Sequence, residues 1–205
     1  MKRVILFLCI ITAFCFPSFA EESSSEHGNK GIDGSIVFQP VRQGDKFMKI
    51  GLSLGVPLFN TSRDKFANKP RIYPGGTINV GFGYYVLNGF SLGGSLSFQF
   101  YPTLAKKLYF AVPITFDMAY TFATGKWRFP IGMGIGGAFQ SYSGNTAKYF
   151  GMIFRPEAGV YYQYSPEWSF GGGVSWSILP QWYRNTSHNR IGNILTVNFA
   201  ARYHF

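Results

Sequence analysis

The sequence predicts an all-β fold, an eight-stranded antiparallel transmembrane up-and-down β-barrel, and three observations lead to that prediction. Apolar residues alternate with small or polar ones through most of the chain after residue 46, as in strands with one face in lipid. Aromatic residues make up 19% of the chain and charged residues only 14%, against about 25% charged in average proteins. The alternation also runs to the last residue, Phe205, whereas soluble domains usually end in frayed, polar residues.

The N-terminus is typical of an export signal. A short positive segment precedes an apolar stretch over residues 4–16, and residues 17–20 supply small side chains at the spacing that signal peptidase recognises. We expect cleavage after Ala20, because an uncleaved anchor helix would need about 20 apolar residues to span a bilayer. Cys9 and Cys15 both lie in this segment, so the mature chain would hold no disulfide or thiolate ligand. Lipid attachment at Cys15 is the alternative.

Three regions follow from this pattern: a cleaved signal peptide over 1–20, a polar and mostly disordered periplasmic leader over 21–46, and the barrel over 47–205. In the stretch 77–86, for example, Ile78, Val80 and Phe82 face one way, and Thr77, Asn79 and Gly81 the other. The predicted strands are 47–56, 77–86, 90–100, 108–122, 127–139, 149–164, 168–178 and 194–205.

The connections alternate between short and long. Tight turns are expected at 87–89, 123–126 and 165–167, and longer loops join the other pairs of strands. An even strand number with short turns at one end is the layout of outer-membrane barrels. Both termini would then be periplasmic and the long loops extracellular. A soluble barrel around a ligand is disfavoured, because turning the apolar face inward would leave a surface of Gly and Ser.

Aromatic residues are expected in two girdles at the lipid–water interfaces. The periplasmic girdle would hold Tyr84, Tyr120, Phe122, Trp127, Tyr162, Tyr164, Trp168, Tyr203 and Phe205. The girdle at the loop end would hold Tyr73, Tyr101, Tyr109, Tyr142, Tyr149, Trp182 and Tyr183. Three prolines inside predicted strands conflict with regular pairing, because proline cannot donate to a ladder. At Pro113, Pro130 and Pro156 we therefore expect bulges, ends of pairing or a shifted register.

The C-terminal strand carries a family resemblance. Phe199, Ala201, Tyr203 and Phe205 occupy alternate positions up to the end of the chain. Together with the topology of residues 47–205, this ending resembles the small eight-stranded outer-membrane barrels of diderm bacteria, the size class of the OmpA transmembrane domain, OmpX and OmpW. The resemblance implies that Phe199, Tyr203 and Phe205 form the signal read by the barrel-assembly machinery. No motif identifies a subfamily.

The predicted long loops hold nine cations against one anion, Asp64. Such loops would attract anionic partners, either lipopolysaccharide or phospholipid headgroups of the envelope or sulfated host glycans. Nucleic acid is not expected as a partner, because no base-reading module is present. The loop cations are Arg63, Lys65, Lys69, Arg71, Lys106, Lys107, Lys148, Arg184 and Arg190.

A second set of charges falls on the inward face of the predicted strands. Buried charges must be paired, and an eight-stranded barrel is just wide enough for side chains to fill. We therefore interpret Asp117, Arg155 and Glu157 as a structural ionic network rather than a conduction gate, although many inward glycines leave room for a narrow water path. The inward charges are Lys49, Asp117, Arg128, Arg155, Glu157 and Arg202.

The function predicted from the sequence is that of a non-enzymatic, monomeric outer-membrane protein whose basic loops contact anionic envelope lipids or host molecules. A narrow channel for small solutes is the first alternative and a lipid-modifying enzyme the second. His27 lies in the leader and His204 at the periplasmic end, and His188 has Ser187 beside it but no carboxylate partner in its loop. No catalytic residue, metal site or cofactor is expected.

Overall fold

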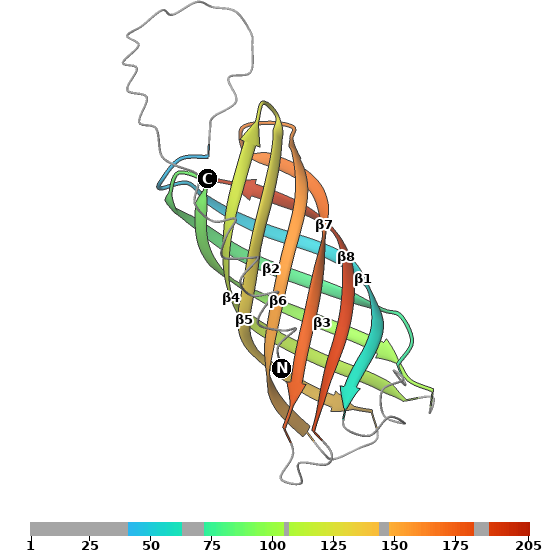
Figure 1. Cartoon of the computed structure of the whole chain (residues 1–205). Helices are drawn as coiled ribbons and strands as arrows, with labels where there is room; N and C mark the ends of the chain where they lie inside the picture. The colour runs from blue at the N-terminus through green and yellow to red at the C-terminus, as the bar shows by residue number, and fades with distance from the viewer. Residues whose placement is uncertain (1–40, 63–71, 105–106, 144–147, 183–188) are drawn as a thin grey trace, which may run out of the picture. The chain divides into compact units, whose positions relative to one another are not determined.

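A computed structural model of the protein describes residues 41–62, 72–104, 107–143, 148–182 and 189–205. The predicted signal peptide and most of the predicted leader lie outside these ranges. All eight predicted strands are present (Figure 1). Their bounds are β1 Lys46–Ser62, β2 Gly75–Leu87, β3 Phe90–Pro102, β4 Leu108–Thr124, β5 Trp127–Tyr142, β6 Lys148–Gln163, β7 Trp168–Gln181 and β8 Arg190–His204. Within the described ranges, no helix is long and apolar enough to cross a membrane.

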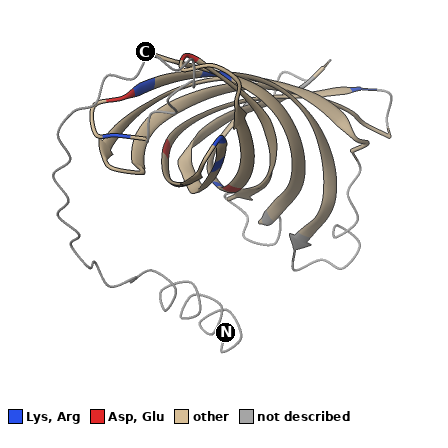
Figure 2. Ribbon diagram, turned by 90° about the horizontal axis from the view of Figure 1, so that it is seen from above, with Lys and Arg blue, Asp and Glu red and all other residues tan. Residues whose placement is uncertain are grey.

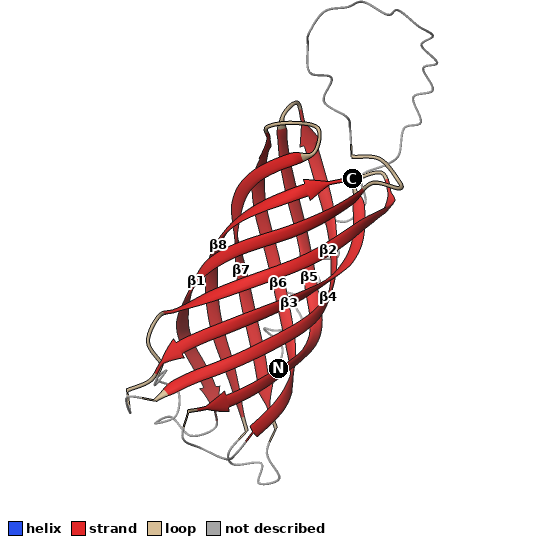
Figure 3. Ribbon diagram, turned by 180° about the vertical axis from the view of Figure 1, so that it is seen from behind, coloured by secondary structure: helices blue, strands red, loops and turns tan. Residues whose placement is uncertain are grey.

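The strands form one closed antiparallel barrel in chain order, β1 to β8, and β8 pairs with β1. The turns between β2 and β3, β4 and β5, and β6 and β7 lie at the end that carries the C-terminus (Figure 3). Gly89 closes the first of these turns with a φ of 81°, a left-handed conformation that favours glycine. The alternation of short turns and longer connections confirms the predicted up-and-down topology.

Several strands continue further toward the loop end than the alternation predicts. β1 runs to Ser62, because its polar residues still pair with β8, as Asn60 does with Gly192. The β1–β8 register shifts between Pro57 and Phe59, so the alternation that defines the strand is lost there while the pairing is kept. With 13 to 17 residues, β1 to β4 exceed the 9–11 that a membrane-spanning strand needs.

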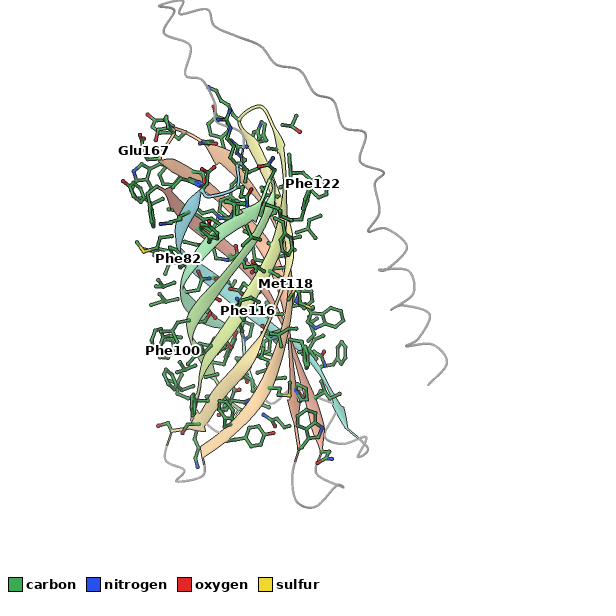
Figure 4. All side chains as sticks on the ribbon, turned by 90° about the vertical axis from the view of Figure 1, so that its left-hand side faces the viewer. Phe82, Phe100, Phe116, Met118, Phe122 and Glu167 are labelled. Atoms are coloured by element: carbon green, nitrogen blue, oxygen red, sulfur yellow. The ribbon has the colours of Figure 1, made fainter. Side chains whose placement is uncertain are left out.

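The two faces of the wall differ as predicted. Large apolar side chains point outward, as Figure 4 shows for Phe82, Phe100 and Phe122, and Phe199 is 73% exposed. Small and polar side chains point inward, and Ser97 is 1% exposed. An apolar exterior around a polar interior is the arrangement that lipid requires.

The girdle predicted for the loop end needs correction. Tyr73 and Trp182 are exposed, but Tyr101 and Tyr109 are buried in the lumen. They share the inward face of β3 and β4 with Gln99 and Ala111, are register partners, and have ring centroids 6.1 Å apart. Both tyrosines lie near strand ends, as girdle residues do, but the alternation of their strands places them on the inward face, and this determines their position.

The three strand prolines interrupt pairing on one side and leave the register unchanged. The breaks adjoin Pro113 in the β3–β4 ladder, Pro130 in the β5–β6 ladder and Pro156 in the β6–β7 ladder. Each proline keeps a register partner on its other neighbouring strand. Because proline has no N–H to donate, interrupted pairing is the expected alternative that the structure adopts.

Candidate functional site in the barrel lumen

The middle of the lumen holds four charged side chains that we call the lumen ion cluster: Lys49, Asp117, Arg155 and Glu157. They come from β1, β4 and β6, and no two of these strands are neighbours in the wall. Each occupies an inward position of its strand, so the period-two alternation directs all four toward the barrel axis. Charged residues are few along the strands, which are mostly tan in Figure 2.

Arg155 occupies the centre of the cluster. Its Nη2 donates to Asp117 Oδ1 at 3.0 Å, to Ser95 Oγ at 2.6 Å and to Thr115 Oγ1 at 3.0 Å. Its Nη1 donates to Ser97 Oγ at 3.4 Å. One guanidinium thus joins β6 to β3 and β4 across the lumen, and the planar fork of arginine suits such multiple donation.

Glu157 joins the two cations of the cluster. Its Oε1 lies 3.4 Å from Lys49 Nζ and its Oε2 lies 3.9 Å from Arg155 Nε. The side chains of Lys49 and Glu157 are 14% and 20% exposed. Little water reaches these charges, so their mutual attraction must offset a desolvation cost of several kcal/mol for each ion. The structure therefore brings Asp117, Arg155 and Glu157 together with Lys49, another of the predicted inward charges.

The other two inward cations lie nearer the C-terminal end of the barrel. Arg128 donates from Nε and Nη2 to Gln163 Oε1 at 3.0 and 2.5 Å. Arg202 stacks over the rings of Tyr161 and Phe47, with 3.8 and 4.8 Å from its Cζ to the ring centroids. Such stacking is worth about 2 kcal/mol when both groups are desolvated. Arg202 is also the register partner of Lys49, but aromatic faces rather than a carboxylate hold it.

The loop end of the lumen is filled by apolar side chains from six strands. They form one buried cluster of Tyr101, Tyr109, Ala111, Ala138, Ile153, Leu179 and Ile194. Tyr101 and Ile153 are each 0% exposed. Polar groups accompany this layer, since the Tyr109 hydroxyl donates to Gln140 Oε1 at 2.8 Å. Together these side chains occupy the end of the lumen that faces the long connections.

Two small cavities flank the lumen ion cluster. One, of about 30 Å³, extends toward Phe47, Ser91 and Arg202. The other, of about 20 Å³, extends toward Thr77, Gln99 and Ser177. Each has room for one or two water molecules, and Lys49 and Glu157 line both. The cluster therefore separates two polar chambers within the barrel.

The predicted loop cations are only partly within the described residues. Lys107 is exposed at the β3–β4 connection, while Lys148 and Arg190 are the first residues of β6 and β8. Arg63, Lys65, Lys69, Arg71, Lys106 and Arg184 lie outside the described residues. The three residues of the predicted assembly signal, Phe199, Tyr203 and Phe205, are exposed on the outer face.

Sequence reasoning missed the aromatic partners of Arg202 and the apolar layer at the loop end. Phe47 and Tyr161 lie on different strands, and only the closed barrel brings both rings to one guanidinium. The apolar layer could have been found from the inward parity of Tyr101, Ile153 and Leu179, three large residues on a face otherwise small and polar. No group of three or more His, Cys, Asp or Glu that could hold a metal occurs in the described ranges.

The chain is similar to other proteins in sequence or in structure. An uncharacterized protein of Treponema pallidum (strain Nichols) is 37% identical over 180 residues, 83% of this chain and 81% of the relative. Neisserial surface protein A superposes with a TM-score of 0.60 at 12% identity, covering 80% of this chain and all of that chain. The outer membrane protein OprG of Pseudomonas aeruginosa gives a TM-score of 0.55 at 12% identity, covering 82% of this chain and 99% of that chain.

A closed eight-stranded barrel with an apolar exterior and a charged lumen is the fold of the small outer-membrane β-barrel proteins. The chain shares that fold with Neisserial surface protein A and OprG. It belongs to the same family as the Treponema pallidum relative, and a protein-family model matches residues 22–203.

Proposed function

We propose that the protein is a non-enzymatic surface protein whose basic loops contact anionic envelope lipids or host glycans. The proposal depends on how the lumen is occupied: its described charges contact one another, aromatic rings or, for Arg128, Gln163, and its loop end is filled. An anionic ligand would then bind at the long loops, where the sequence places nine cations and one anion, Asp64. Such loops would face the cell exterior, with both termini in the periplasm.

A structural role for the Ser–His contact at the opposite end supports the non-enzymatic assignment. His204 Nε2 lies 2.9 Å from Ser169 Oγ, at the distance that a catalytic pair would have. Ser169 is however only 1% exposed. A substrate cannot reach that hydroxyl, so the contact holds β7 to β8 at the end of the barrel.

The proposal is tested by binding of the refolded barrel to vesicles of phosphatidylglycerol and to heparin. The double variant Lys69→Ser/Arg71→Ser should bind both probes several-fold more weakly, because surface attraction contributes about 1 kcal/mol per cation. The matched control is Arg42→Ser/Lys46→Ser, which removes the same charge from exposed residues at the other end. Binding of wild type should also weaken as salt rises.

Equal loss of binding in the two double variants would contradict a role for the loops. Binding to neutral phosphatidylcholine vesicles as strong as to anionic ones would contradict the proposed class of ligand.

A narrow channel is the second candidate, favoured by the two polar cavities on either side of the lumen ion cluster. Planar-bilayer recordings distinguish the two functions. Conductance steps that change in Asp117→Asn or Glu157→Gln would support a channel through the cluster, whereas a closed lumen predicts no steps in either variant or in wild type.

A further inference from the structure

The cavity on the loop side of the lumen ion cluster has an unusual chemical lining. Five strands contribute hydroxyl groups to it, among them Ser53, Thr77, Ser97, Ser177 and Thr196. Two cations, Lys49 and Arg155, line the same cavity against one carboxylate, Glu157. The chamber is therefore rich in hydrogen-bond donors, and Asp117, which is bound to Arg155, completes the balance of charge beside it.

The described lumen as a whole, unlike the lumen ion cluster itself, holds more cations than carboxylates. Lys49, Arg128, Arg155 and Arg202 face only two inward carboxylates, Asp117 and Glu157. In a closed lumen of low dielectric, an excess of cations is costly unless a counter-charge is present. A bound anion would lower that cost.

Donor groups in the cavity are available for such an ion. Arg155 Nε is buried and has no hydrogen-bond partner within the described ranges. Thr77 Oγ1 is buried beside the Tyr101 hydroxyl and can take part in binding an ion there. Arg155 is 7% exposed and Thr77 6%. Arg155 Nε lies 3.9 Å from Glu157 Oε2, beyond hydrogen-bond distance.

Two further hydroxyls are oriented to donate. Ser53 Oγ accepts from Asn79 Nδ2 at 3.3 Å and Ser97 Oγ accepts from Arg155 Nη1 at 3.4 Å. Because each oxygen already receives a hydrogen bond, its own hydrogen remains free to donate elsewhere.

We propose that this cavity binds a small monovalent anion of the halide class, chloride under ordinary conditions. Its volume of about 20 Å³ suits an occupant of one or two water volumes, such as a single halide ion. A metal cation is disfavoured by Lys49 and Arg155. The ion is held by hydroxyl donors and by the two cations, and it stabilises the barrel by binding only the folded state.

The experiment compares urea unfolding of the refolded protein in sodium chloride and in sodium gluconate at equal ionic strength. Gluconate is too large for the cavity, so the unfolding midpoint should rise with chloride concentration and stay constant with gluconate. A second measurement uses crystals grown in sodium bromide, where an anomalous peak between Thr77 and Arg155 is expected.

Thr77→Val and its matched control Thr121→Val separate this site from the rest of the lumen. Thr121 is equally buried, at 4% exposed, but lines the other cavity. Loss of one hydrogen bond to the ion should weaken chloride binding roughly tenfold in Thr77→Val, whereas Thr121→Val should keep the chloride dependence of wild type.

Equal midpoints in chloride and gluconate, or bromide peaks only outside the cavity, would overturn the proposal and leave water as the occupant. An unchanged chloride dependence in Thr77→Val would also overturn it.

Discussion

Arg155 links three strands, because its guanidinium on β6 donates hydrogen bonds to side chains of both β3 and β4. These partners are three hydroxyl groups and the carboxylate of Asp117, all at inward positions. The inward direction of Asp117, Arg155 and Glu157 could be predicted from the period-two alternation. Which charges meet could not, because contacts across the lumen depend on strand tilt and stagger.

A first prediction concerns the carboxylates of the lumen ion cluster. Asp117→Asn leaves Arg155 without its closest carboxylate, which lies at 3.0 Å. We expect the free energy of unfolding to fall by about 3 kcal/mol, the usual cost of leaving a buried charge unpaired. Urea unfolding of the refolded protein measures this change. The control is Asp45→Asn at the rim, which should change the stability by less than about 1 kcal/mol.

A second prediction concerns the fit of an inward ring against a glycine. A Cβ added at Gly83 would lie 2.3 Å from the Phe47 ring, and that ring also supports Arg202. Gly83→Ala should therefore cost about 2 kcal/mol of stability through overpacking. Gly76→Ala on the outer face of the same strand meets nothing within 4 Å and should be neutral. Equal midpoints for the two variants in urea would show that Phe47 yields without cost.

The ladder between β6 and β7 is the least regular of the barrel. Its pairing ends at Phe154↔Ile178 and is broken beside Pro156, although β6 itself continues to Lys148 along β5. Tyr149 supplies a substitute for backbone pairing, because its hydroxyl accepts the N–H of Trp182 at 2.8 Å. The sequence could predict that pairing is interrupted at Pro156, but not whether the interruption affects the ladder with β5 or the ladder with β7.

Pro156→Val should repair part of that ladder. It restores one backbone donor, and one hydrogen bond typically contributes about 1 kcal/mol. We expect a higher unfolding midpoint and slower amide exchange over residues 148–156, measured by hydrogen–deuterium exchange with mass spectrometry. Ala158→Val, on the same outward face, adds apolar surface without a new donor and should leave exchange unchanged. Equal exchange in wild type and Pro156→Val would mean that the proline is not the cause of the break.

The whole molecule follows closely from the pattern of its sequence, because strand number, order and faces are all set by alternation and turn length. What the pattern could not supply is the vertical layering of the lumen. An apolar layer, an ionic layer and an aromatic–cation layer follow one another along the axis, and each is assembled from residues far apart in the chain. The alternation assigns side chains to the inward face but does not tell which of them meet, because that depends on which strands oppose one another in the closed barrel.

A prediction at this scale concerns the last residue. Phe205 exchanges backbone hydrogen bonds with Lys46, at 3.0 and 3.2 Å. Deleting Phe205 should lower the amount of protein in the outer membrane several-fold, because we expect the terminal aromatic residue to be read during assembly. The stability of the refolded barrel should fall by only about 1–2 kcal/mol. Phe205→Trp keeps an aromatic terminus and serves as the control; unchanged membrane levels on deletion would contradict the assembly role.

The same two bonds between Lys46 and Phe205 make the cylinder continuous across its own ends. Every strand, including β1 and β8, has a paired strand on both sides. A short linker could join these residues and new ends could be opened in the turn at Asn88, giving a circular permutant with the same lumen. Comparing its refolding in vitro with its insertion in cells would distinguish the role of the C-terminal strand in the stability of the folded barrel from its role in assembly.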